Sequence, residues 1–364
     1  LTRLLSWGGK FRLVAERWIP APKEIQCADY DESVASFATR RLGREAFERL
    51  VQPLLAGIYT ADPEQLSLAA TMPDAIVAER EYGSLTRAIL HKARQASSEG
   101  GGSDSRASGA RYASFVTPRE GLGQLIEALA QRLPPAGIHL GKPISRVSRT
   151  SDQKWMVYLE NNEPCGPYDG VVVAVPAPLA AVLVDEVDPQ LGELLSNISY
   201  ASSAVVCLVY RRDQIARQLD GFGLVMPSVE QKNIVAASFS SVKYPGRAPD
   251  DQVLVRVFLG GALQPEKVDL TDEKLQQLAE DELGELIGIR GAPLRVDVVR
   301  WREKMPQYHV GHVQLVEAIE QRVAQLDGLE LAGNAYRGVG IPQCIHSGDN
   351  AARRLLAHFP PGPE

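Results

Sequence analysis

The residues best suited to chemistry lie near the C-terminal end, where a short apolar strand is followed by a glycine-rich turn and a helix. The strand is expected at 329–332, the turn carries Gly333, Gly338 and Gly340, and Pro342 stands in the first turn of the helix. Glycines lack a Cβ and let a planar ligand approach the backbone, and a helix N-terminus offers unpaired N–H groups and a positive dipole end. The run can therefore hold the electron-rich edge of a planar ligand. A plain strand–turn–helix connection is the alternative that this spacing leaves open.

Other candidates for chemistry are weaker. His309 and His312 form the run HVGH, but no third His, Asp or Glu stands at a metal-ligand spacing from them, so no metal site is predicted. The GxSxG motif of serine hydrolases is absent. Four cysteines stand far apart without a CxxC pair, which favours buried or incidental thiols in a reducing compartment; they are Cys27, Cys165, Cys207 and Cys344.

The elements that must position the glycine turn alternate between helices and strands. Apolar residues at three- and four-residue spacing predict helices at 33–42, 45–55, 85–96, 272–287 and 313–326, and a last one ending near His358. A further helix opens at Glu120 and Gly121, and one of its faces carries Leu122, Leu125, Ile126, Leu129 and Leu133. β-Branched runs predict strands at 144–147, 155–159, 171–175, 204–210, 234–238 and 253–259. Residues 97–110 read as a linker, and the alternation predicts an α/β core interrupted by insertions.

Length, composition and charge narrow the class of protein. The 364 residues are 45% hydrophobic and 23% charged, which is typical of a globular chain of two or three domains. A net charge of −6 argues against a nucleic-acid binder. Basic residues near the start alternate with Trp7, Phe11 and Trp18. This pattern suits an amphipathic segment on an anionic membrane surface, and a partly buried helix with a solvated basic face is the alternative.

Three runs resemble one family in order along the chain. They are QPLLAGIYTADPEQLSLAATMP from Gln52, WREKMPQYHVGH from Trp301 and LELAGNAYRGVGIPQCIHSGDNAARRLL from Leu329. The first resembles a pocket-lining G-[IV]-[YF] motif and the last a C-terminal FAD motif. The chain is thereby identified as a member of the protoporphyrinogen and coproporphyrinogen oxidases within the flavin-containing amine oxidase superfamily. An amine oxidase proper would carry G-Y-[MV]-[DE]-G where this chain has Gly338-Val-Gly-Ile-Pro.

The resemblance implies a fold and a domain order. It implies a mixed α/β (α+β) protein with a split FAD-binding domain of the p-hydroxybenzoate-hydroxylase type and a substrate domain with an antiparallel sheet. A helical membrane-binding domain is expected at 1–112, the two parts of the FAD domain at 113–180 and 327–364, and the substrate domain at 181–326. The expected location is the cytoplasm, peripherally on the inner face of the cell membrane.

The resemblance also implies a reaction and its participants. FAD would oxidise a porphyrinogen to a porphyrin in haem biosynthesis, in three two-electron rounds, with dioxygen reduced to peroxide. Protoporphyrinogen IX is the expected substrate and coproporphyrinogen III the alternative. The flavin carries the chemistry, so no catalytic side chain is expected. The implied partners to be tested are a ferrochelatase that takes the product, a membrane surface and a second copy of the chain.

Site residues follow from the same resemblance. The residue expected at the adenine of FAD is Ile144, and those expected at the flavin are Asn334, Val339, Gly340 and Ile341. The residues expected at the substrate are Gly57, Val225 and Tyr244. For Val225 and Tyr244, plain core packing is the alternative.

Two departures from the family pattern stand out. The family opens with a GxGxxG fingerprint that cradles the pyrophosphate, and these 364 residues contain no such run. Gln343 also stands where many relatives have Asp. We therefore expect an N-terminally truncated member, and a non-catalytic scaffold is the alternative function.

Overall fold

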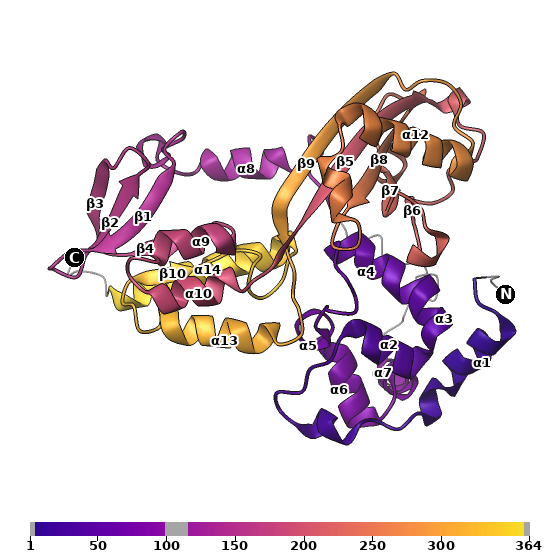
Figure 1. Cartoon of the computed structure of the whole chain (residues 1–364), viewed down its shortest axis with the longest axis horizontal. Helices are drawn as coiled ribbons and strands as arrows, with labels where there is room; N and C mark the ends of the chain where they lie inside the picture. Colours follow the sequence, from indigo (N-terminus) through magenta and orange to yellow (C-terminus); the bar gives the residue numbers. More distant parts are fainter. Residues whose placement is uncertain (1–3, 99–115, 360–364) are drawn as a thin grey trace.

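The computed structural model describes residues 4–98 and 116–359. The predicted linker at 97–110 lies outside the described residues except at its start, where Ser97 and Ser98 still belong to a helix. Helices, a small parallel sheet and a larger antiparallel sheet succeed one another along the chain (Figure 1).

The N-terminal part is helical. Its helices are α1 (Trp7–Val14), α2 (Val34–Leu42), α3 (Arg44–Ala46), α4 (Gln52–Tyr59), α5 (Leu68–Thr71), α6 (Pro73–Tyr82) and α7 (Leu85–Ser98). The single helix predicted at 45–55 is instead divided by a π-helical segment, Phe47–Val51. The physical reason is Pro53, which has no N–H for the helical ladder and stands in the first turn of α4.

The second part of the fold is built on a two-stranded parallel sheet of β10 (Leu329–Leu331) and β4 (Val171–Val173). The helices packed around it are α9 (Ala177–Val184), α10 (Pro189–Ser196), α13 (His312–Val323) and α14 (Ile341–His358). The antiparallel strands β1 (Ile144–Arg149), β2 (Trp155–Leu159) and β3 (Pro164–Tyr168) form a separate sheet. The continuously apolar run at 171–175 predicted a strand covered on both faces, but Val172 is 38% exposed. One face of β4 is therefore uncovered at Val172.

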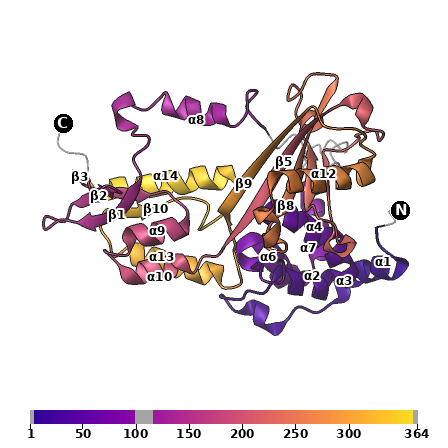
Figure 2. The same cartoon turned by 45° about the horizontal axis from the view of Figure 1, so that its top comes forward.

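The antiparallel sheet has the strand order β6-β7-β8-β5-β9. Its strands are β5 (Tyr200–Arg211), β6 (Gly223–Val225), β7 (Ala236–Phe239), β8 (Gln252–Gly260) and β9 (Arg295–Pro306), with α12 (Asp272–Ile287) packed on one face and α11 (Ser240–Lys243) after β7. Sequence reasoning missed β9, because charged residues interrupt its apolar positions and only Val296 and Val298 pack against the core. The helix predicted from Glu120 is α8 (Gly123–Ala130), which both views show set apart from the layer of α9 and α14 (Figures 1 and 2).

Among residues 4–98 and 116–359, no helix is both long enough and apolar enough to cross a membrane.

Candidate cofactor and substrate site

The glycine turn and the start of α14 have the predicted geometry. Gly340 is the N-cap residue, and Pro342 lies in the first helical turn. The first helical hydrogen bond runs from Cys344 N to Gly340 O (3.0 Å), so the N–H groups of Ile341 and Gln343 precede the intrahelical ladder. Gly338 has φ +131°, a conformation that requires glycine. The turn therefore offers donors and a dipole end to an electron-rich ligand edge.

Tyr308 holds this turn in place. Its hydroxyl donates to the carbonyl oxygen of Asn334 (2.6 Å) and accepts from the N–H of Gly338 (2.8 Å). Its ring is buried and stacks on His312, with ring centroids 4.0 Å apart and an interplanar angle of 14°. Burial raises the pKa of Tyr308, so its hydroxyl stays protonated and donates. Sequence reasoning treated this tyrosine only as part of a motif.

His312 anchors the other side of the turn and is the source of a pH effect. Its Nε2 lies 3.0 Å from the carbonyl oxygen of Tyr336, and burial lowers its pKa below the ordinary 6.5. Burial likewise lowers the pKa of His309. Burial therefore favours the neutral form of both histidines.

The free energy of unfolding is expected to fall as the pH drops below 6.5, because the unfolded chain then binds protons that buried His312 resists. The slope is at most about 1.4 kcal/mol per pH unit for each histidine. Urea unfolding of wild type and His312→Gln between pH 7.5 and 5.5 measures it. The variant should lose part of the slope, and an unchanged slope would show that His312 does not cause the effect.

The run that begins at Gln52 and the run that begins at Trp301 are joined by backbone hydrogen bonds and by one carboxylate. Ser67 N donates to Tyr308 O (2.7 Å) and Val310 N donates to Gln65 O (2.9 Å). Asp31 accepts from the hydroxyl of Ser67 (2.7 Å) and from the N–H of Gly311 (3.1 Å). Asp31 therefore fixes the frame around Tyr308. No sequence signal could have found it, because it is distant in sequence from both motifs.

The predicted substrate residues fall into two places. Gly57 in α4 faces Val225 in β6, since a Cβ at Gly57 would lie 3.6 Å from a Val225 methyl group. Val225 is 40% exposed, so plain core packing is excluded for it. Tyr244 lies beyond the other end of β7, because Val225 pairs with Ala236 at the start of that strand. The structure thus brings Gly57 and Val225 together and leaves Tyr244 apart.

Two cations lie near the ring of Tyr244. Lys243 Nζ is 5.3 Å from the centre of its half-buried ring, and the Arg247 guanidinium is 6.0 Å away. Arg247 also donates to the hydroxyl of Thr117 (3.0 Å) and to the carbonyl oxygen of Pro118 (2.9 Å). The cluster therefore ties the segment before α8 to the antiparallel sheet and presents positive charge beside an aromatic face.

Ile144 lies away from the glycine turn. It opens β1, is 38% exposed, and belongs to the sheet that both views place by the C-terminal end of α14 (Figures 1 and 2). An 18-residue helix is about 27 Å long. Ile144 and the turn at Gly340 can therefore contact only opposite ends of an extended ligand.

The described residues fit one end of a dinucleotide and leave the middle unsupported. A Cβ at Gly338, which has φ +131°, would overlap Cγ and Cβ of Gln343, so this position needs glycine, whereas a Cβ at Gly340 would meet chiefly the movable end of the exposed Gln343 side chain. A pyrophosphate, however, needs a glycine-rich loop before a second helix, and the sequence lacks the GxGxxG run. The adenine and flavin ends have candidate residues, whereas the pyrophosphate has none of the expected type.

Comparisons with known proteins place these features in a family. Residues 1–356 match the family model described as flavin containing amine oxidoreductase. A coproporphyrinogen III oxidase of Bacillus subtilis is 30% identical over 98% of this chain and 73% of its own length. The protoporphyrinogen oxidase of Bos taurus is 32% identical over 91% of this chain and 70% of its own. A crystal structure from Exiguobacterium, assigned as a protoporphyrinogen oxidase, matches with a TM-score of 0.78 and 26% identity over 98% of this chain and 74% of that chain.

Proposed function

Because the chain belongs to the flavin containing amine oxidoreductase family, and is thus a flavin-dependent oxidoreductase whose cofactor is FAD, we propose that it oxidises a porphyrinogen to the porphyrin in haem biosynthesis. Relatives named as protoporphyrinogen and as coproporphyrinogen III oxidases both match at about 30% identity. The substrate we propose is protoporphyrinogen IX, with coproporphyrinogen III as the alternative.

The observation that supports this proposal is the place of α4. Tyr59, at its end, packs with Val339 and Tyr308 in one cluster, and the amide of Gln307 donates to the Tyr59 carbonyl oxygen (3.3 Å). Two residues earlier, Gly57 faces Val225. The same short helix therefore reaches from the glycine turn to an exposed apolar surface on β6, where a large apolar macrocycle can lie beside the flavin end.

The chemistry requires little from side chains. FAD supplies a two-electron acceptor when it is bound. Loss of six electrons and six protons converts a porphyrinogen to a porphyrin, and three dioxygen molecules become three hydrogen peroxide molecules. The residues described above would bind, orient and exclude water: the turn held by Tyr308 would position the flavin end, and α4 with β6 would cover the ring.

The experiment is an absorbance spectrum of the purified chain before and after addition of FAD, followed by fluorescence turnover on both porphyrinogens. Porphyrin fluorescence with peroxide release would support the proposal. Flavin uptake without turnover of either porphyrinogen would overturn it. The second candidate is a non-catalytic scaffold, and a folded chain that takes up no flavin would support it.

Tyr244→Ala is expected to raise the KM for porphyrinogen about tenfold, because losing an aromatic face costs about 1.5 kcal/mol or more. kcat and the melting temperature should change little, since Tyr244 is outside the buried core. Steady-state kinetics of the flavin-loaded protein measure this, with Tyr244→Phe as the control that keeps the aromatic ring near Lys243 and Arg247. An unchanged KM with lowered stability would mean that Tyr244 only packs.

A membrane surface is the partner that we propose for the first helix. α1 and the 3-10 turn after it (Ala15–Trp18) expose an apolar row at three- and four-residue spacing. This N-terminal aromatic row consists of Leu4, Trp7, Phe11, Val14 and Trp18, which are 54%, 67%, 72%, 61% and 66% exposed. Cations flank it, with Lys10 Nζ and the Arg17 guanidinium each 4.8 Å from an indole centre. Exposed aromatic residues with basic neighbours suit the interface of an anionic bilayer.

The domain organisation remains part of the proposal. We assign 1–112 to this membrane-facing helical part, 113–180 and 327–364 to the FAD part, and 181–326 to the substrate part. The two-stranded parallel sheet with its glycine turn and the five-stranded antiparallel sheet support the last two assignments.

A further inference from the structure

The face of the antiparallel sheet that α12 does not cover carries an apolar row across all five strands. By register, this open-face row runs from β6 to β9 and consists of Val225, Ala236, Phe258, Val205 and Val299. None of the five belongs to the apolar cluster that α12 covers, and Val225 and Val299 are 40% and 43% exposed. The solvated face of an antiparallel sheet is ordinarily polar, so this row suits an apolar ligand.

The open-face row lies between the end of α4 and an arginine. Thr60, which follows α4, accepts through its carbonyl oxygen from the N–H of Ala262 (2.8 Å), just beyond the end of β8. In the other direction along β8, Arg256 precedes Phe258 by two residues and therefore lies on the same face. Its guanidinium leans back towards the row, 5.4 Å from the centre of the Phe258 ring. The face thus has an apolar middle and a cationic side opposite α4.

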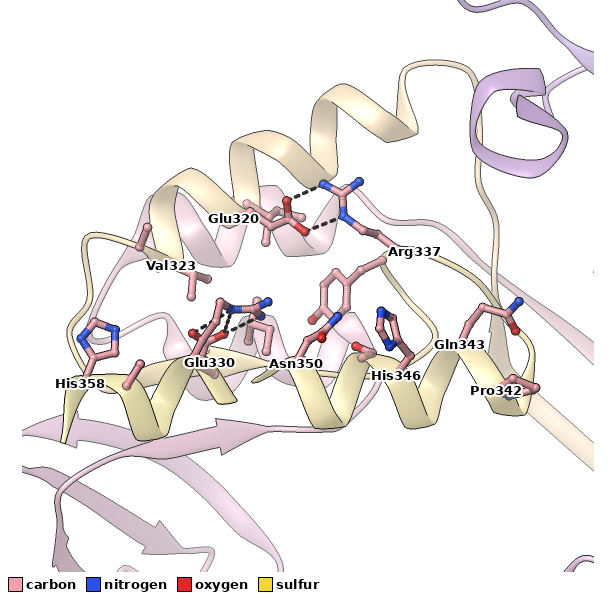
Figure 3. Close-up of a pocket in the computed structure, with 16 residues that line it drawn as sticks. Glu320, Val323, Glu330, Arg337, Pro342, Gln343, His346, Asn350 and His358 are labelled. Carbon is pink, nitrogen blue, oxygen red and sulfur yellow. Dashed lines mark hydrogen bonds and ion pairs between the residues drawn. The ribbon is translucent and has the colours of Figure 1, made fainter. Parts of the chain in front are cut away.

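Arg256 has no carboxylate partner. It is the exposed residue of β8, and within residues 4–98 and 116–359 no carboxylate lies at ion-pair distance from its guanidinium. The arginines of the pocket between α13 and α14 show the contrasting arrangement, because Arg337 binds Glu320 and Arg354 binds Glu330 (Figure 3). The charge of Arg256 is therefore available to an anionic group from outside the chain.

The residues beside Arg256 on neighbouring strands leave this positive charge uncompensated. Ser238 on β7 and Cys207 on β5 are its register partners, and Asp297 on β9 pairs with Cys207. Asp297 is occupied by Arg295 (2.7 Å), so its charge is already balanced. The Ser238 hydroxyl is a hydrogen-bond donor next to the guanidinium. An arginine fork beside a hydroxyl is suited to a carboxylate, which accepts several hydrogen bonds.

We propose that Arg256 binds a propionate carboxylate of the porphyrinogen while the macrocycle lies on the open-face row. The inference deepens the proposed oxidation and rests on it for the identity of the ligand. Successive residues on one face of a strand are about 7 Å apart, so a carboxylate on a short side chain reaches Arg256 from a ring placed over Phe258. The acidic edge of the substrate then points away from α4, and the opposite edge lies towards α4 and the glycine turn.

The test compares the binding of protoporphyrin IX with that of its dimethyl ester, which keeps the ring but has no carboxylate. The change in porphyrin absorbance on titration with the purified chain and FAD, in one mild detergent, gives the Kd of each ligand. Arg256→Gln is expected to weaken binding of the acid about tenfold or more, because a charge-assisted hydrogen bond is lost. Binding of the ester should not change, and the ratio of the two effects removes the contribution of the detergent.

Two further variants locate the contact. Arg256→Lys keeps the charge but loses the planar fork, so it should recover part of the affinity for the acid. The matched control is Arg290→Gln, which removes an exposed arginine from the connection between α12 and β9, next to Ile289 of the cluster under α12. It should bind both ligands as wild type does. Because Arg256 and Arg290 are exposed, the melting temperatures of all three variants should stay close to that of wild type.

The inference is overturned if wild type binds neither ligand, if Arg256→Gln binds the acid as well as Arg290→Gln does, or if it weakens the acid and the ester equally. None of these readouts uses a porphyrinogen, so turnover of a porphyrinogen by the wild-type chain would leave the proposed oxidation as it stands. Conversely, a loss confined to the acid, in a chain that oxidises neither porphyrinogen, would reject the proposed reaction and retain the carboxylate contact.

Discussion

Glu16→Gln is expected to lower the free energy of unfolding by about 3 kcal/mol, because it removes one partner of a fully buried ion pair. Glu16 is 1% exposed and Arg41 is 0% exposed. The Glu16 carboxylate accepts from Arg41, from the Ser84 hydroxyl (2.8 Å) and from the N–H groups of Leu85 (2.9 Å) and Thr86 (3.1 Å). It thereby joins the 3-10 turn after α1 to α2 and to the start of α7.

The expected loss stays near the low end for a broken buried pair, because Glu79 remains 3.2 Å from Arg41. The lowered pKa of Glu16 supports a loss of free energy of unfolding of the same size. Burial alone would raise it, but hydrogen bonds from Thr86, Ser84 and Leu85 lower it from 4.5 to about 2, and one pKa unit is about 1.4 kcal/mol.

The same shift gives a pH signature. A carboxylate with a lowered pKa stabilises the fold above pH 4.5, and this stability is lost as the pH falls from 4.5 towards 2. Glu16→Gln should lose this acid dependence. The window is separate from that of His312, which begins at pH 6.5.

Urea unfolding at pH 7 measures the effect. Glu48→Gln is the matched control, because Glu48 forms an i,i+4 pair with Arg44 whose arginine side chain is 82% exposed. Such surface pairs contribute about 0.5 kcal/mol. Equal losses for Glu16→Gln and Glu48→Gln would show that the buried pair does not hold the first helices in place.

The second large effect concerns the N-terminal aromatic row. Replacing Trp7, Phe11 and Trp18 by glutamine is expected to weaken binding to anionic vesicles at least 100-fold, since each large apolar side chain contributes about 2 kcal/mol when buried. All three are at least 66% exposed, so the fold should not change.

Co-sedimentation with vesicles of phosphatidylcholine and phosphatidylserine measures this binding. The control is a double variant, Leu263→Gln with Leu294→Gln, which removes exposed apolar residues elsewhere, 45% and 53% exposed, and should bind as wild type. Binding should weaken with added salt, because Lys10 and Arg17 lie beside the row. Absent binding of the wild-type chain, or unchanged binding of the triple variant, would exclude the membrane contact.

Local order was predictable because it is encoded by neighbouring residues. The strand, the three glycines and Pro342 set the turn and the start of α14, since glycine freedom and proline geometry act within a few residues. Periodicity likewise predicted the strands at β5 and β8 and the helix α12. In β9, charged residues broke the periodicity, and the strand was not predicted. At 45–55, one helix was predicted from the apolar run, but Pro53 lies within it and the structure divides the helix.

The arrangement of the site was decided by tertiary packing. The facing of Gly57 and Val225, the two hydrogen bonds of the Tyr308 hydroxyl, and the bridging by Asp31 each join residues far apart in the sequence. The same is true of apolar side chains that packing leaves exposed, such as the N-terminal aromatic row and Val172 of β4. A sequence pattern states which face of an element is apolar, but only the folded chain determines whether another element buries that face, because burial depends on which segments meet.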